Sequence, residues 1–434
     1  MADRLPLLLR SYRLLTMAAV PLASLLLTYR LKRGKEHAER LPERRGEAVL
    51  ARPEGPLVWL HGASVGELNA ILPLIERIRQ RDVTVLVTSG TVTSADLAER
   101  RLPPDVIHQF APLDVPPFVA RFLDHWKPSL ALFVESDLWP NLILASSERN
   151  IPLILINGRL SERSFGRWRM APRSIGHLLQ RFDLCLAQSA ADAARYQNLG
   201  APRVATTGNL KLDVPAPAAD DDKLQAIKTA VGRRPVIAAA STHPGEEIAV
   251  VDAHRRLKHT FPGLLTLIAP RHPQRGPGIA EIARNAGLTA ALRSLGQLPG
   301  ADTDIYVADT LGELGLVYRM APIVFMGGSL VSHGGQNPIE AAKLGAAILH
   351  GPHVFNFAEI YAALDKAGGA EEVTDAGKLA VRIGAWLKDS DTRRGVAETS
   401  LKALDTLVGA LDRTVEALDP YLMQFRLERR SDHA

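Results

Sequence analysis

The stretch His61-Gly62-Ala63-Ser64-Val65-Gly66-Glu67 directly follows the apolar run 57–60. A second stretch, Gly327-Gly328-Ser329, follows the apolar run 323–326 and leads into Gly334-Gly335-Gln336-Asn337-Pro338-Ile339-Glu340. A strand that ends in glycines and enters a helix exposes backbone N–H groups at the positive end of the helix dipole. Each stretch also carries a carboxylate. The two stretches predict two α/β domains that close on a reaction between an anionic donor and an acceptor.

Short apolar runs alternate with helical patterns along most of the chain. They lie at 57–60, 83–88, 130–134, 153–156, 184–187, 204–206, 236–240, 264–269, 305–307, 323–326 and 346–349. This alternation is typical of doubly wound, mostly parallel sheets with helices on both faces. We therefore expect a first Rossmann-like domain at 34–213, a linker at 214–234 and a second Rossmann-like domain at 235–405. A C-terminal helix at 406–434 is expected to pack back on the first domain.

The positive charge of the chain is concentrated near its N-terminus. Residues 1–45 hold ten Lys or Arg and four Asp or Glu, whereas the whole chain of 434 residues carries only +5. This distribution argues against a nucleic-acid partner. Residues 14–29 carry no charge, and Arg13 and Arg30 flank them, where their side chains can snorkel. A full membrane span needs about 20 apolar residues.

We therefore interpret residues 1–33 as a membrane-anchoring helix with a basic flank, the alternative being a buried amphipathic helix. The basic residues after the apolar segment place the remaining chain in the cytoplasm.

Several polar motifs follow expected strands, and each has a structural alternative. Glu67 is either a general base beside a glycine turn or a helix-capping residue. Glu135 and Asp137 follow the run 130–134, where α/β folds place their sites, or they mark a helix entry before Pro140. Arg159 opens a cationic stretch that is either an anion-binding surface or a solvated face.

The second half repeats this pattern around potential phosphate ligands. Ser241 ends an expected strand, Arg271 and His272 end the next, and Thr310, Gly312 and Glu313 lie in a further turn. Ser and Thr are ordinary N-caps, yet hydroxyl and N–H groups in such turns also suit a phosphate. The histidines lack metal-ligand spacing, so no metal site is predicted. Together these motifs favour nucleotide binding.

Read together, the motifs resemble those of the 3-deoxy-D-manno-octulosonic acid (Kdo) transferases. The resemblance runs along nearly the whole chain. The motifs that carry it are Arg33-Gly-Lys-Glu36, Arg40-Leu-Pro-Glu43-Arg44, 61–67, Thr88-Ser-Gly-Thr91, 135–141, 157–164, Gly208-Asn-Leu-Lys211, 241–247, 270–272, 309–314 and 327–340.

The resemblance implies a GT-B fold with two Rossmann-like domains facing a cleft. The N-terminal domain would bind the acceptor, a lipid A precursor such as lipid IVA, and the C-terminal domain would bind CMP-Kdo. The reaction would be an inverting transfer in lipopolysaccharide biosynthesis, without a metal or other cofactor, at the cytoplasmic face of the inner membrane.

The resemblance also implies roles for individual residues. Glu67 and Glu135 would be catalytic, with Glu67 as the base. Acceptor-binding residues would be Ser64, Gly66, Asp137 and Arg159. Donor-binding residues would be Ser241, Arg271, His272, Thr310, Gly312, Glu313, Gly328, Ser329, Asn337 and Glu340. Arg271 and backbone N–H groups near Gly328 and Ser329 would stabilise the departing phosphate. The family usually has Gly-Gly-His-Asn where this chain has Gln336, which keeps hydrogen bonding but does not titrate near neutrality.

Two other functions compete with this interpretation. One is another GT-B enzyme, a UDP-sugar transferase or epimerase, which the apolar N-terminus and the motif at 135–141 disfavour. The other is a non-catalytic, membrane-tethered protein that binds a sugar nucleotide, which the intact base and donor motifs disfavour.

Overall fold

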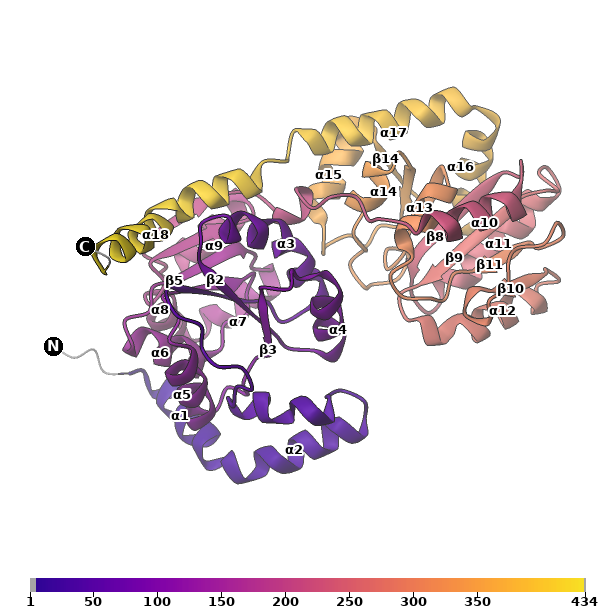
Figure 1. Cartoon of the computed structure of the whole chain (residues 1–434). Coiled ribbons are helices and arrows are strands. Elements are labelled where there is room, and N and C mark those ends of the chain that lie inside the picture. Colours follow the sequence, from indigo (N-terminus) through magenta and orange to yellow (C-terminus); the bar gives the residue numbers. More distant parts are fainter. Residues whose placement is uncertain (1–4, 433–434) are drawn as a thin grey trace. The chain divides into compact units, whose positions relative to one another are not determined.

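The computed structural model describes residues 5–432, and in the last helix it describes side chains up to residue 425. The chain divides into two compact units (Figure 1). The first contains the residues up to Val214 together with those from Val408 onward, and the second is Pro215–Leu407.

The first unit is built on a seven-stranded sheet in which every pairing is parallel, in the order β3-β2-β1-β4-β5-β6-β7. The strands are β1 (Leu57–His61), β2 (Thr84–Ser89), β3 (Ile107–Phe110), β4 (Leu130–Val134), β5 (Leu153–Gly158), β6 (Leu184–Ala187) and β7 (Val204–Thr206). The helices are α1 (Leu7–Ala18), α2 (Val20–Lys32), α3 (Val65–Arg79), α4 (Val92–Arg101), α5 (Pro116–Trp126), α6 (Pro140–Glu148), α7 (Glu162–Arg169), α8 (Pro172–Leu179), α9 (Ala190–Asn198) and α18 (Ala410–Asp432), with 3-10 turns η1 (Ala38–Arg45) and η2 (Leu210–Leu212).

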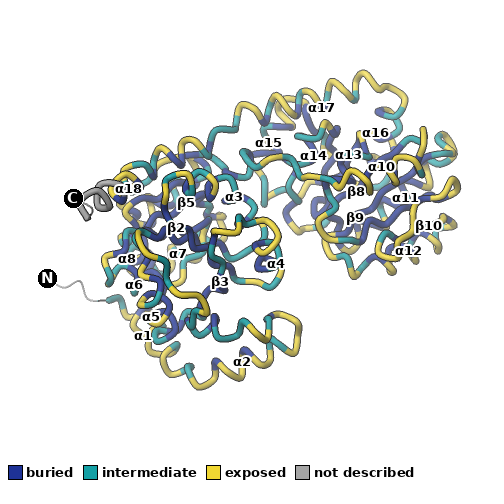
Figure 2. The backbone as a smooth tube through the Cα atoms, in the orientation of Figure 1, coloured by how far each residue is buried: buried dark blue, intermediate teal, exposed yellow. Residues whose placement is uncertain are grey.

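Alternate residues of each strand enter separate cores on the two faces of this sheet. Leu57 and Trp59 pack with side chains of α5, whereas Val58 and Leu60 pack with side chains of α3. The second core also takes Leu418 of α18, which is fully buried. The C-terminal helix is therefore a part of the first unit (Figure 2).

The second unit repeats this architecture with a parallel sheet in the order β10-β11-β9-β8-β12-β13-β14. Its strands are β8 (Val236–Thr242), β9 (Leu265–Pro270), β10 (Ala290–Leu292), β11 (Ile305–Val307), β12 (Ile323–Met326), β13 (Ala347–His350) and β14 (Ala370–Glu372). Its helices are α10 (Asp221–Val231), α11 (Glu246–Lys258), α12 (Gly276–Asn285), α13 (Leu314–Met320), α14 (Ile339–Lys343), α15 (Ala358–Ala367), α16 (Ala376–Lys388) and α17 (Ser390–Asp405), with 3-10 turns η3 (Pro273–Arg275) and η4 (Arg293–Leu295). The expected doubly wound sheets are confirmed in both units.

The N-terminal segment differs from the single helix expected at 1–33. Among the described residues, no one helix is long and apolar enough to cross a membrane. The pair α1 and α2 meets the requirements of length and composition together, but the two helices are bent by 70° relative to each other. The segment also contacts the first unit, because the Tyr12 hydroxyl donates to Asp114 at 2.9 Å and Leu9 is buried.

The linker expected at 214–234 is in part a helix. Residues Asp221–Val231 form α10, and Asp220 caps it by accepting a hydrogen bond from the Lys223 N–H. Leu224 and Ile227 are buried, and α10 contacts α13. The helix therefore belongs to the second unit.

Candidate active site

The first candidate site lies where the strand order of the first unit reverses, between β1 and β4. In doubly wound sheets, ligands bind beyond the carboxyl ends of the strands at this reversal. β1 leads into the turn before α3, and β4 leads into Glu135 and Asp137. Parallel pairing of β1 with β4 places both loops at the same edge of the sheet.

Glu67 is the third residue of α3, and its carboxylate closes the turn that precedes the helix. Ser64 is the N-cap: its hydroxyl donates to Glu67 Oε1 at 2.8 Å and accepts from the Glu67 N–H at 3.3 Å. The Ala63 N–H donates to Glu67 Oε2 at 2.7 Å. Glu67 therefore makes the contacts of a helix-capping residue, which was the alternative to a catalytic role. These contacts also hold its carboxylate in one place.

The surroundings of Glu67 favour its protonated form. Burial raises the pKa of the Glu67 carboxyl, and the negative charges of Glu135 and Asp137 raise it further. The hydrogen bonds from Ser64 and Ala63 act in the opposite direction without cancelling the rise. The pKa of Glu67 is therefore above that of an ordinary glutamate, as suits a general base working near neutral pH.

Glu135 and Asp137 each have a cationic or hydrogen-bonding partner. Lys211 Nζ lies 2.5 Å from Glu135 Oε1, and His61 Nε2 lies 3.0 Å from Asp137 Oδ2. Burial by itself would raise the pKa of Asp137, but its interactions with His61 and Trp139 outweigh burial and lower it. Glu135 also has a φ of 60°, in the left-handed region that non-glycine residues rarely adopt. Such local strain is concentrated at functional sites.

The remaining acceptor candidates lie around the same edge. Gly66 is exposed, and outside its own helix backbone the nearest atom to a Cβ added there would be the Ser64 hydroxyl oxygen, at 3.9 Å. The protein itself has room for a side chain at Gly66, so the glycine leaves open space beside Glu67. The backbone carbonyl of Arg159 accepts a hydrogen bond from Tyr196, whose hydroxyl also lies 3.2 Å from the carbonyl of Glu135.

In the second unit, the glycine turn after β12 does not present its N–H groups as the sequence suggested. The carboxylate of Glu246, which is 1% exposed, accepts hydrogen bonds from the N–H groups of Gly328 at 2.7 Å and Ser329 at 2.9 Å. It also accepts from the N–H groups of His243 and Leu330. The Gly328 and Ser329 N–H groups, which the resemblance assigned to a departing phosphate, are therefore already occupied by an internal carboxylate.

Of the other donor candidates, Ser241 is buried at the end of β8, whereas the two that follow β9 are accessible. Ser241 has a φ of 56°, so strained backbone also occurs at the end of β8. Arg271 and His272 are exposed directly after β9. Within the described part of the chain, the Arg271 guanidinium has no ion-pair partner. It is therefore available to an anion.

Two glutamates of the second unit have contrasting surroundings. Glu313 accepts hydrogen bonds from Arg293, Lys223 and the Thr310 hydroxyl, and these contacts, Arg293 foremost, lower its pKa to about 2. Its neighbour Gly312 has a φ of 79°. Burial instead raises the pKa of Glu340, which has no hydrogen-bonding partner among the described residues. Glu340 is therefore the carboxylate of this pair that is open to a ligand hydroxyl.

Gln336, the departure from the family pattern, contacts a histidine cluster. Its Nε2 lies 3.1 Å from His243 Nε2, and the His243 ring stacks on that of His333 with the centroids 4.2 Å apart. Burial and the neighbouring His333 and His272 lower the pKa of His243 to about 4, so its ring is neutral at pH 7. Asn337 accepts a hydrogen bond from the Ile339 N–H at the start of α14. Among residues 5–432, no group of three or more His, Cys, Asp or Glu is placed to hold a metal ion.

Sequence reasoning did not assign roles to Lys211, His61 and Glu246, although each lies in a quoted motif. His61 ends an apolar strand, which is a signal for a polar group at the site edge. Lys211 and Glu246 gave no comparable signal, because their partners are 76 and 82 residues away in sequence.

The two Rossmann-like units, each with polar groups at its strand reversal, define a two-domain protein of the GT-B fold class. Solved structures of similar fold include a glycosyltransferase from Rickettsia africae (14% identity, TM-score 0.59, covering 85% of this chain and 99% of that one). Another is a UDP-N-acetylglucosamine 2-epimerase from Listeria monocytogenes described as putative (14% identity, TM-score 0.58, covering 86% and 98%).

Residues 39–214 match the family model of 3-deoxy-D-manno-octulosonic-acid transferase (kdotransferase). A probable mitochondrial 3-deoxy-D-manno-octulosonic acid transferase of Arabidopsis thaliana is 39% identical over 369 residues, covering 82% of this chain and 83% of the relative. The 3-deoxy-D-manno-octulosonic acid transferase of Haemophilus influenzae is 34% identical over 395 residues, covering 89% and 92%. The chain belongs to the Kdo transferase family and is therefore a glycosyltransferase, which confirms the resemblance and disfavours both competing functions.

The role of Glu246 is open to a direct test. In Glu246→Gln, one oxygen becomes an NH₂ group that faces two of the four N–H donors. We expect a loss of stability of about 1–3 kcal/mol for each buried N–H left without an acceptor. Differential scanning calorimetry measures the change, with Glu281→Gln on the exposed surface of α12 as the matched control. An unchanged transition in Glu246→Gln would show that the turn does not depend on the carboxylate.

Proposed function

We propose that this enzyme transfers Kdo from CMP-Kdo to a hydroxyl group of a lipid A precursor, lipid IVA, with inversion at the anomeric carbon. The acceptor hydroxyl gives its proton to Glu67 as its oxygen forms a bond to the anomeric carbon. The bond from that carbon to the phosphate oxygen breaks, and its electron pair leaves with CMP. The step uses no metal, because Arg271 supplies the positive charge that the leaving phosphate needs.

The observation that carries this proposal is that three neighbouring carboxyl groups have different electrostatic surroundings. Lys211 forms an ion pair with Glu135, and His61 lowers the pKa of Asp137, whereas burial and like charges raise the pKa of Glu67. Neighbouring acids whose environments push their pKa values apart have separate roles. Glu67 is therefore the base, while Glu135 keeps Glu67 basic through its charge.

Donor binding is assigned to the accessible groups of the second unit. Arg271 is exposed after β9, where a guanidinium forms paired hydrogen bonds with a phosphate or carboxylate. CMP-Kdo carries both groups. Burial raises the pKa of Glu340, and its carboxyl group is proposed to accept a hydrogen bond from a ribose hydroxyl. Gly328 and Ser329 shape this turn through Glu246 rather than contacting the phosphate through their N–H groups.

The N-terminal helices are proposed to lie on the cytoplasmic face of the inner membrane, close to the lipid acceptor. Many residues of α1 and α2 are exposed (Figure 2), and large apolar residues are among them. They are Leu7, Leu8, Leu14, Leu15, Met17, Leu22, Leu25, Leu26 and Tyr29. Exposed apolar patches with flanking basic residues are typical of helices that lie in a lipid interface. The contacts of Tyr12 with Asp114 hold this surface to the first unit.

The assignment of the base predicts that Glu67→Gln slows transfer by about 10²–10⁴-fold, because the amide cannot accept the hydroxyl proton. Transfer is measured by mass spectrometry of lipid IVA incubated with CMP-Kdo. Calorimetric titration with CMP is expected to remain unchanged, since nucleotide binding is assigned to the second unit. In the wild type, the acidic limb of the pH profile of kcat should lie above the ordinary glutamate pKa of about 4.3, as the raised pKa requires.

Glu76→Gln is the matched control, because Glu76 is an exposed residue of the same helix that pairs with Arg79. Turnover of Glu67→Gln within threefold of the wild type would remove Glu67 from the mechanism. If the wild-type enzyme also forms no product in this assay, then lipid IVA or CMP-Kdo is the wrong substrate.

The donor assignment predicts that Arg271→Ala raises KM for CMP-Kdo and slows turnover, with little change in KM for the lipid. The loss of a charged hydrogen bond of this kind costs about 1.5–3 kcal/mol. Steady-state kinetics with each substrate varied in turn measure the effect. Arg284→Ala, an exposed position on α12, is the control. An effect confined to the lipid would assign the second unit to the acceptor.

The membrane assignment predicts weaker lipid binding when the exposed face of α2 becomes polar. The triple variant Leu22→Ser/Leu25→Ser/Leu26→Ser should bind anionic phosphatidylglycerol vesicles at least about tenfold less tightly, since each buried leucine contributes about 1.5–3 kcal/mol. Vesicle co-flotation measures binding, and Leu401→Ser on α17 is the control. Equal flotation of both variants and the wild type would reject this face as the membrane contact.

A further inference from the structure

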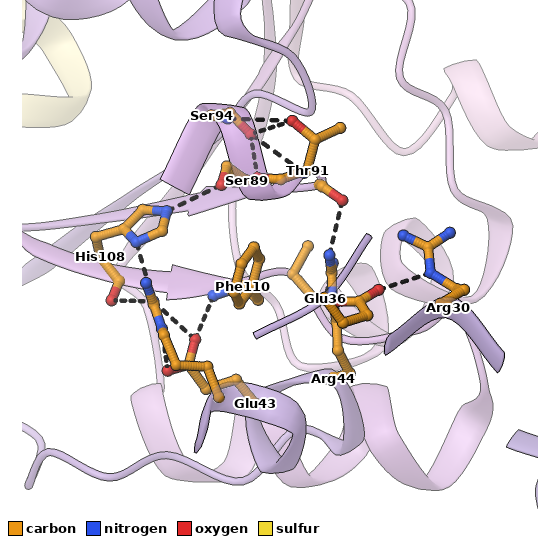
Figure 3. A network of polar contacts seen from close by, with 12 residues as sticks. Arg30, Glu36, Glu43, Arg44, Ser89, Thr91, Ser94, His108 and Phe110 are labelled. Atoms are coloured by element: carbon orange, nitrogen blue, oxygen red, sulfur yellow. Dashed lines mark hydrogen bonds and ion pairs between the residues drawn. The ribbon is translucent and has the colours of Figure 1, made fainter. Parts of the chain in front are cut away.

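A buried ion pair lies outside the proposed reaction groups, on the segment that connects α2 to the first sheet. Glu36 and Arg44 are 6% and 4% exposed, and Arg44 Nε lies 2.9 Å from Glu36 Oε2 (Figure 3). The other oxygen of Glu36 lies 2.6 Å from Nε of Arg30, which is in the last turn of α2. One carboxylate therefore joins α2 to Arg44.

The guanidinium of Arg44 holds two loops at the carboxyl edge of the sheet. Its Nη2 donates to the carbonyl of Gly90, after β2, at 2.7 Å, and its Nη1 donates to the carbonyl of Ala111, after β3, at 3.2 Å. Its planar group also lies over the ring of Phe110 at 4.3 Å. A lysine at this position has a single cationic group and cannot reproduce this fork.

Gly90 also contacts the turn that holds Glu67. The Gly90 N–H donates to the carbonyl of Ala63 at 3.0 Å, and the Ala63 N–H donates to Glu67 Oε2 at 2.7 Å. A Cβ at position 90 would meet the same carbonyl at 3.0 Å, so the two loops are in close contact. An unbroken series of polar contacts therefore runs from Arg44 through Gly90 and Ala63 to the carboxylate of Glu67.

We propose that Glu36 and Arg44 are positioning residues for Glu67, which they orient through the Gly90 and Ala63 loops and link to α2. This inference rests on the proposed role of Glu67 as the base. Displacement of a reacting group by about 1 Å reduces turnover by about 10²-fold. Because Glu36 and Arg44 are buried in the first unit and nucleotide binding is assigned to the second, their substitution should lower kcat and leave nucleotide binding unchanged.

A double-mutant cycle tests this inference with Arg44→Lys, Glu67→Gln and the double variant, using single-turnover transfer from CMP-Kdo to lipid IVA. Residues that act through a shared group are not additive in such a cycle. Arg44→Lys should reduce the rate by about 10²-fold in the wild-type background. In the Glu67→Gln background the same substitution should change the rate by less than about twofold, because the positioned carboxylate is already absent.

Arg52→Lys is the matched control for loss of a carbonyl-binding arginine. Arg52 donates to the carbonyls of Pro53, Gly55 and Trp126, at the opposite, amino edge of the same sheet. It should lower the melting temperature without lowering kcat. If Arg44→Lys does not fold by circular dichroism, Glu36→Gln replaces it in the cycle.

The outcomes separate the two proposals. An undiminished rate in Glu67→Gln contradicts the base assignment. A slow Glu67→Gln that Arg44→Lys slows by a further 10²-fold contradicts the positioning role and leaves the base assignment intact. A wild-type rate in folded Arg44→Lys also contradicts the positioning role, as does an equal loss of kcat in Arg52→Lys.

Discussion

The burial of Glu67 beside the negative charges of Glu135 and Asp137 governs the carboxyl edge of the first sheet. Burial weakens the solvation of a charge, and nearby charges of the same sign oppose ionisation further. Lys211 and His61 stabilise Glu135 and Asp137, and Glu67 is left with a raised pKa. The rest of the first unit brings these partners together: the start of α3 supplies Glu67, the loop after β4 supplies Glu135 and Asp137, and the η2 turn supplies Lys211.

In the second unit, a buried carboxylate is stabilised by backbone N–H groups. Its glycine turn concentrates N–H donors, which an anionic ligand could satisfy, yet the buried carboxylate of Glu246 accepts four of them. The turn is therefore organised before any donor binds. Positive charge for an anion must instead come from an accessible side chain, and Arg271 meets that condition. Organisation in advance reduces the entropy that binding would otherwise lose.

The central strands were predictable because they are buried on both faces and read as continuous apolar runs. The strands that the pattern missed are β3, β10 and β14, and each lies at an edge of its sheet. Edge strands are half covered, so β3 carries His108 and Gln109 and β14 carries Glu371 and Glu372. Similarly, the uncharged segment 14–29 predicted an anchor but not the bend between α1 and α2, which falls at Ala19 just before Pro21.

The sequence by itself determined the two doubly wound units, the family and the positions of the candidate carboxylates. These features depend on local order: apolar periodicity sets the strands, and parallel strands bring their following turns to one edge. Only the tertiary structure decided which carboxyl group has a raised pKa, which N–H groups are occupied and how α2 is linked to the turn that holds Glu67. Those properties arise from pairs such as Glu135 with Lys211 and Glu246 with Gly328, which are far apart in the chain. Electrostatic and hydrogen-bonding energies depend on distance and burial in space, and neither quantity is set by sequence neighbours.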